Sequence, residues 1–119
     1  MKKQIKISVA DSESTTKDFV NAWKHVEKGE KVEVEERLTF EDLETLLRML
    51  TSVRWTLLKK LRQKGPMSIR SLANELDRNY KNVHMNVRLL ERMGLIDRTK
   101  EDKVKVPWDI VEARLRLAA

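Results

Sequence analysis

The segment from residue 68 to residue 106 carries the pattern that most limits how this chain can fold. Apolar residues recur at helical spacing over 69–76, stop at the polar residues 77–79, and recur at helical spacing again over 80–93. Residues 97–99, which continue as a strand, and the alternating stretch 104–106 then flank a charged turn, which predicts a β-hairpin over 97–106. The segment therefore predicts a short helix, a tight turn, a longer helix and a hairpin, in that order.

A further helix is expected just before this segment. It starts at the cap residues Thr51 and Ser52, runs to about Gln63, and stops at Gly65 and Pro66. A helix followed by this order of elements is typical of the winged helix-turn-helix, whose longer helix enters the major groove of duplex DNA. We therefore expect an α+β, mostly helical winged helix-turn-helix with a β-hairpin wing and short N- and C-terminal strands.

The charge of the chain is distributed unevenly along its length. The net charge is +6, but residues 1–51 carry 9 Lys and Arg against 11 Asp and Glu, whereas residues 52–119 carry 16 against 8. Acidic residues are absent from 78–88. A basic half favours a polyanionic partner such as nucleic acid, with an ordinary solvated surface as the alternative.

The outward side chains of the longer helix and the basic side chains of the hairpin are the candidate DNA contacts. Asn can pair with adenine, Lys and Arg with guanine, and Met85 or Tyr80 can meet a thymine methyl group, while hairpin cations neutralise phosphates. Asn79 serves equally as a helix cap, and Tyr80 equally as a packing residue. The predicted DNA-binding residues are Arg78, Asn79, Tyr80, Lys81, Asn82, His84, Asn86, Arg88, Arg98, Lys100, Lys103 and Lys105.

Several stretches also carry a family resemblance. They are Met67–Ala73, Arg78–His84, Leu90–Ile96 and Val106–Trp108. Together they resemble a family of small archaeal and bacterial MarR-like winged-helix transcriptional regulators. The resemblance implies sequence-specific binding of double-stranded DNA, and, since some members look like antitoxins, a small partner protein as well. The family pattern has Gly-Arg-Asp before the Tyr and a charged residue at the Met85 position, so base preference stays open.

The first half is expected to form an extension, 1–50, beside a DNA-binding domain, 51–119. Its alternation predicts a strand at Ile5–Val9, and its apolar spacing predicts a helix over 17–28 that Gly29 ends. Lys31–Glu36 reads as a weak strand or an extended connection. A second helix is expected to open at Thr39, in a capping box with Asp42.

The first half also offers candidate dimerisation surfaces. Leu43, Leu46, Leu47 and Leu50 form one apolar stripe, with an internal core packed on Leu57 and Leu61 as the alternative. The alternating tail 111–117 favours a strand, although its residues are also helix formers. That strand is a natural partner for Ile5–Val9, within one chain or between two.

The residue inventory argues against an enzyme. The chain has no Cys and only two His, His25 and His84, and it shows no phosphate-binding loop, dinucleotide fingerprint or nucleophile elbow. No cofactor and no metal are expected. No apolar run could span a membrane and no signal sequence is visible, so a cytoplasmic protein is expected.

These features predict a dimeric repressor. A recognition helix at about 80–93 would enter the major groove, and a wing at 97–106 would lie on the phosphate backbone. The alternative is an antitoxin, or another interaction module, that binds a small partner protein through residues 1–50.

Overall fold

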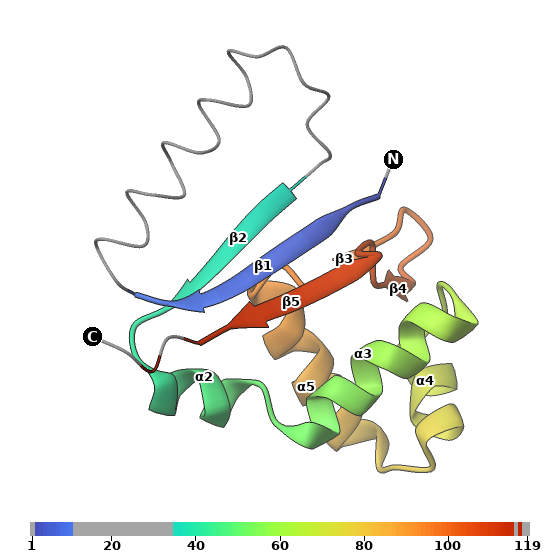
Figure 1. Cartoon of the computed structure of the whole chain (residues 1–119). Coiled ribbons are helices and arrows are strands. Elements are labelled where there is room, and N and C mark those ends of the chain that lie inside the picture. The colour runs from blue at the N-terminus through green and yellow to red at the C-terminus, as the bar shows by residue number, and fades with distance from the viewer. Residues whose placement is uncertain (1, 11–34, 116, 118–119) are drawn as a thin grey trace. The chain divides into compact units, whose positions relative to one another are not determined.

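The described residues fold into two units that interleave along the sequence. The structure is a computed structural model that describes residues 2–10, 35–115 and 117. Unit 1 comprises the described residues of Met1–Met49 and Asp109–Ala119, and unit 2 comprises Leu50–Trp108 (Figure 1). The chain passes from unit 1 to unit 2 between Met49 and Leu50, and the tail after Trp108 belongs to unit 1. Strands and helices are both present, so the chain is an α+β protein.

Unit 1 is built on a parallel sheet in which β1 lies between β2 and β5 (Figure 1). Ile5 and Ile7, two residues apart on β1, are 2% and 0% exposed, as one face of a half-buried strand requires. Ile7 lies opposite Leu38 on one side and Ala113 on the other. The predicted N- and C-terminal strands and their pairing within one chain are confirmed. The strands are β1 (Gln4–Val9), β2 (Glu35–Phe40) and β5 (Ile110–Arg114).

The helix expected from Thr39 begins later than predicted. Thr39 and Phe40 belong to β2, where Phe40 pairs with Val9 and is 7% exposed. Leu38 and Phe40 alternate as readily as they fit a helix, and the pairing with β1 decides for the strand. The helix α2 (Leu43–Met49) starts after Asp42, whose Oδ1 accepts a 2.7 Å hydrogen bond from the Thr45 N–H. The predicted capping box is therefore wrong, because Asp42 itself caps the helix.

Unit 2 contains the helices and the hairpin that the sequence predicts between Thr51 and Val106 (Figure 1). The Thr51 side chain caps α3, and Gly65, at φ 86°, ends it. Ser68 caps α4 through a 3.1 Å hydrogen bond from the Ser71 N–H. The elements are α3 (Ser52–Lys64), α4 (Ile69–Leu76), α5 (Tyr80–Arg92), β3 (Asp97–Arg98) and β4 (Val104–Lys105).

The core of unit 2 fixes which face of α5 points outward. Val83, Val87 and Leu90 are fully buried, as their spacing predicts. The hairpin is anchored beside this core by Val104, whose backbone pairs with Met67 at 2.8 and 3.1 Å. Other large side chains of unit 2 that are less than 2% exposed are Leu57, Leu61, Leu72, Leu95 and Ile96.

The tight turn between α4 and α5 has a clear backbone cause. Asp77 adopts the left-handed conformation at φ 52° and ψ 50°, which Asp tolerates better than most residues. Its N–H and that of Arg78 donate to Asn74 and Ala73 carbonyls at 3.2 and 3.0 Å, which closes α4. Asn79 then caps α5, so three residues suffice to redirect the chain.

The four leucines proposed for dimerisation differ in exposure. Leu46 and Leu50 are each 5% exposed and Leu43 is half-buried. Leu47 is 59% exposed. The predicted helix over 17–28 with its Gly29 cap lies outside the described residues, as do all but Glu35 and Glu36 of the expected extended segment.

Candidate functional site

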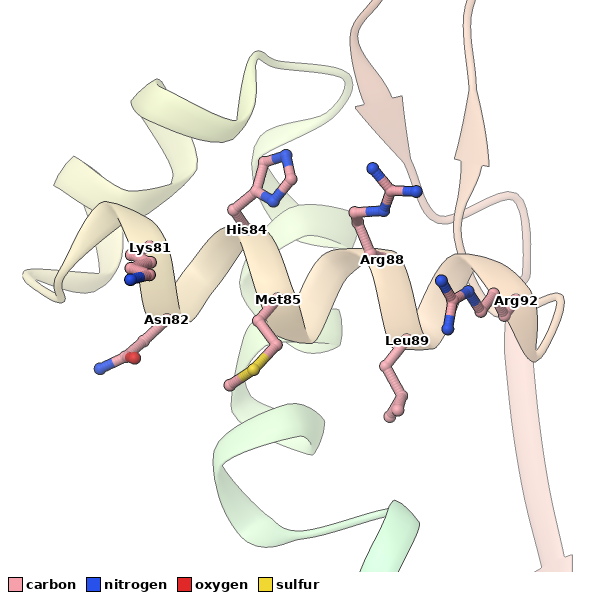
Figure 2. Close-up of a pocket in the computed structure, with 7 residues that line it drawn as sticks. All are labelled: Lys81, Asn82, His84, Met85, Arg88, Leu89 and Arg92. Atoms are coloured by element: carbon pink, nitrogen blue, oxygen red, sulfur yellow. The ribbon is translucent and has the colours of Figure 1, made fainter.

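The outward side of α5 presents a continuous surface to solvent. It lies opposite the buried residues of the helix and forms a shallow concavity of about 400 Å³. Figure 2 shows His84 and Arg88 on one side of the helix axis and Met85 and Leu89 on the other. We call this surface the basic face; its residues are Lys81, Asn82, His84, Met85, Arg88, Leu89 and Arg92.

The basic face carries positive charge and has no carboxylate among its own residues. Lys81, Arg88 and Arg92 are cationic, and none of the seven described residues that form the face is acidic. The unit to which it belongs carries 14 Lys and Arg against 6 Asp and Glu, a net charge of +8. The sequence predicted Lys81 and Arg88 but missed Arg92, which lies one turn beyond Arg88 on the same helix.

Apolar side chains occupy part of the same face. Met85 is 61% exposed, and Leu89, one turn further along α5, is half-buried. Figure 2 shows both side chains on the side of the helix where Asn82 also projects. The face therefore combines an apolar row with a basic row.

The turn before α5 positions two of the predicted residues. Asn79 Oδ1 accepts hydrogen bonds from the N–H groups of Lys81 at 2.9 Å and Asn82 at 3.4 Å. The cap that the sequence offered as an equal alternative is thus formed. Arg78 is exposed beside it.

Tyr80 is the centre of a stacked group at the N-terminal end of α5. Its ring is 42% exposed, with the Arg70 guanidinium 4.8 Å from its centroid and the His84 ring 5.8 Å away at 42°. Such a cation–π contact fixes both side chains at the surface. Sequence reasoning missed Arg70; its place between the buried residues Ile69 and Leu72, on the outer side of α4, was the signal for it.

Asn86 does not belong to the basic face. It is half-buried, and its Oδ1 accepts a 3.0 Å hydrogen bond from Arg54 Nε on α3. The prediction that Asn86 points outward is wrong. Asn86 lies at the edge of the buried stripe of α5, where Arg54 of α3 forms the hydrogen bond with it.

The hairpin is tied to α5 by Arg98. Arg98 Nε donates to both carboxylate oxygens of Glu91, at 3.0 and 3.2 Å, and Nη1 donates to Asp102 at 2.9 Å. The Glu91 hydrogen bond, followed by the one to Asp102, raises the pKa of Arg98 above its ordinary value. Arg98 was expected to meet phosphate, but two carboxylates balance its charge.

The other predicted hairpin cations are less constrained. Lys103 Nζ lies 3.7 Å from Glu101, and both side chains are largely exposed. Lys100 is exposed at the turn, and Lys105 is half-buried opposite Asp97. Of the predicted hairpin cations, Lys100 and Lys103 are therefore the two whose exposed charges best suit contact with phosphate.

A second concavity, of about 590 Å³, lies between α5 and the hairpin. Carboxylates of Glu91 and Asp102 stand there beside guanidinium groups, in contrast to the basic face. Its residues are His84, Arg88, Glu91, Arg92, Arg98 and Asp102. His84, Arg88 and Arg92 therefore border both surfaces.

The described residues contain neither a cluster of metal ligands nor a membrane-spanning helix. Within residues 2–10, 35–115 and 117, no three His, Asp or Glu side chains gather as a metal site would require. In the same part of the chain, no helix combines the length and the apolar character needed to cross a bilayer.

Comparison with known proteins shows one family match. No curated protein and no solved structure matches the chain. A family model described as HVO_A0114 matches residues 49–113, which is more than half of the chain and includes α3, α4, α5 and the hairpin. The chain therefore belongs to the HVO_A0114 family.

Proposed function

We propose that unit 2 is a winged helix-turn-helix and that the protein is a sequence-specific regulator that binds double-stranded DNA. The order α3, α4, α5 and hairpin, with a three-residue turn before α5, supports this assignment. In this arrangement α5 is the recognition helix and the β3–β4 hairpin is the wing. An α-helix fits the major groove of B-form DNA, which is about 12 Å wide.

The observation that carries the proposal is the basic face. A solvent-exposed helix side with three cations and no carboxylate repels other basic surfaces and attracts a polyanion. Its neutral polar side chain, Asn82, can pair with the edge of adenine, and His84 can donate to guanine. The face therefore offers both the phosphate contacts and the base contacts that specific recognition needs.

The contacts divide by position. Lys81, Asn82 and His84 lie in the first half of α5, which is the part of a recognition helix that meets base edges. Arg88, Arg92 and Lys103 lie further along the helix or on the hairpin, where they neutralise phosphates. Two copies bound to a palindrome would act as a dimeric repressor, as the resemblance to MarR-like regulators also implies.

The direct test is fluorescence anisotropy with two duplexes at several salt concentrations. One duplex is the region upstream of the protein's own gene, and the other is a scrambled duplex of equal length. We expect a preference on the order of a thousandfold for the upstream duplex. Absence of binding to either duplex at low salt would overturn the proposal.

A matched pair of variants separates the contribution of the basic face to DNA binding from that of the net charge of the protein. Arg88→Glu reverses a charge on the face, whereas Lys59→Glu reverses an exposed charge on α3. Both change the net charge equally. We expect Arg88→Glu to weaken binding about tenfold or more, and Lys59→Glu to change it far less. Equal losses would assign binding to net charge alone.

A second candidate function is supported by Leu47. This large aliphatic side chain is 59% exposed on α2, in the unit with nearly balanced charge. Exposed aliphatic surface suits a protein partner, such as a small toxin bound by an antitoxin. Co-purification with the product of a neighbouring gene, lost on Leu47→Asp, would support this function.

A further inference from the structure

One of the exposed positions of the basic face is apolar. Val83 and Val87 are fully buried, and Met85, midway between them, points away from the core with 61% of its surface exposed. Leu89 follows four residues later on the same side of α5 (Figure 2). A helix inserted into a groove therefore brings Met85 to the floor of that groove.

The surroundings of this apolar row define its partner. Lys81, Arg88 and Arg92 lie beside it on the same face, and none of the described residues of the face is acidic. A partner must therefore be anionic at its rim and apolar where Met85 reaches. Duplex DNA meets both conditions in the major groove, because phosphates line its edges and thymine methyl groups project from its floor.

The chemistry of methionine limits which groups in the major groove Met85 can contact. Its thioether has no hydrogen-bond donor, so it cannot pair with the acceptor edge of guanine, and as a weak acceptor it pairs poorly with the amino groups of cytosine and adenine. The methyl group of thymine is the apolar group that base pairs present in the major groove. We propose that Met85, supported by Leu89, reads thymine methyl groups and makes the protein selective for A·T pairs at that position; this inference rests on the proposed function.

Asn82 extends the same selectivity. It lies three residues before Met85, and Figure 2 shows it on the same side of the helix. The cap that Asn79 forms with the Asn82 N–H uses only the backbone of Asn82, which leaves the amide side chain outside the cap. Asn pairs in a bidentate manner with adenine. Met85 and Asn82 together thus favour A·T pairs at neighbouring positions of the site.

The test begins by selecting a preferred duplex from a random pool with the full-length protein. Each thymine of that duplex is then replaced in turn by deoxyuridine, which removes the methyl group and retains every hydrogen-bonding atom. We expect one or two replacements to weaken binding about fourfold each, the factor that burial of one methyl group gives.

Variants assign that effect to Met85. In Met85→Ala the loss on deoxyuridine replacement should disappear, while Met85→Leu should retain it. Alanine favours helices and the position is exposed, so both variants should unfold at the wild-type temperature. Lys59→Ala is the matched control, because it shortens an exposed side chain of α3 that does not belong to the basic face, and it should keep the full thymine dependence.

Failures of the two ideas are distinguishable. A selected duplex bound equally well with thymine and with deoxyuridine would overturn the thymine inference while the DNA-binding function stands. A thymine dependence that persists in Met85→Ala would overturn it in the same way. Absence of binding to the pool, or binding that enriches no sequence, would overturn the thymine inference together with sequence-specific recognition.

Discussion

The guanidinium of Arg98 holds the carboxylate of Glu91 through a forked hydrogen bond from Nε, at 3.0 and 3.2 Å to the two oxygens. Seven residues separate the two in sequence, and the contact joins β3 to the last turns of α5. Asp102 adds a 2.9 Å bond from the tip of the hairpin to Nη1. The Arg98 side chain thus links the hairpin to α5, and the two carboxylates neutralise its positive charge.

Arg98→Ala should therefore change DNA binding differently from the loss of a phosphate contact. We expect affinity to fall because the hairpin loses its tie to α5, while the slope of log K against log salt changes by well under one. Each ion pair is partly exposed, so the free energy of unfolding should fall by about 1 kcal/mol or less. A slope reduced by about one would place Arg98 on a phosphate after all.

Lys103→Ala is the contrasting variant. Its ammonium lies 3.7 Å from Glu101, and the exposed fractions of the two side chains are 47% and 79%, so the pair is weak. We expect all duplexes to be bound about equally less well, with the salt slope reduced by about one. Anisotropy titrations at four or more salt concentrations give both quantities. An unchanged salt slope would show that Lys103 does not contact DNA.

The sequence predicted α4, the turn and α5 because each signal was local. Ser68 and Asn79 cap helices with their own side chains, and the spacing of Val83, Val87 and Leu90 can be satisfied only on one helix face. The hairpin was equally local, with strands joined across a short turn. Such features need no knowledge of distant residues.

The predictions from sequence were wrong where a residue far away in the sequence determines the local structure or the side-chain contact. Thr39 and Phe40 fit a helix start as well as a strand end, and β1, some thirty residues earlier, selects the strand. Asn86 was placed on the outer face, but Arg54, thirty-two residues earlier, holds it at the helix edge. The stack of Arg70 on Tyr80 depends likewise on how α4 packs against α5.

Substitution of Asn86 should lower the stability of the protein, whereas substitution of Asn82 should change its base preference. Asn86→Ala removes the acceptor of the 3.0 Å bond from Arg54, so the free energy of unfolding should fall by about 1 kcal/mol with little change in base preference. Asn82→Ala should leave stability unchanged and flatten the preference at one position by about tenfold or more. Urea unfolding and competition binding measure the two effects. A reversed outcome would place Asn86 in the DNA interface.

Asn79→Ala tests the cap of the recognition helix. The side-chain oxygen satisfies the N–H groups of Lys81 and Asn82, and its loss should lower the free energy of unfolding by about 1 kcal/mol. Asn79→Ser keeps a capping oxygen and should stay close to wild type. If Asn79→Ser binds DNA as weakly as Asn79→Ala while remaining stable, Asn79 contacts DNA in addition to capping the helix.

Asp42 should make the stability of α2 depend on pH in the acid range. Hydrogen bonds from the Thr45 side chain and then from its backbone N–H lower the pKa of Asp42 below its ordinary value of 3.8. A carboxylate with a lowered pKa in the folded state stabilises that state above its ordinary pKa, and the contribution is lost as the pH falls through the lowered value. Asp42→Asn retains an uncharged capping oxygen at every pH.

The difference in melting temperature between wild type and Asp42→Asn should therefore be constant near neutrality and fall below about pH 4. Asp42→Ala should melt below both proteins at pH 7, because it removes the acceptor for the Thr45 N–H. Circular dichroism melts at half-unit pH steps would measure all three proteins. A difference between wild type and Asp42→Asn that grows on acidification would show that the charged cap destabilises α2, contrary to the geometry of its hydrogen bonds.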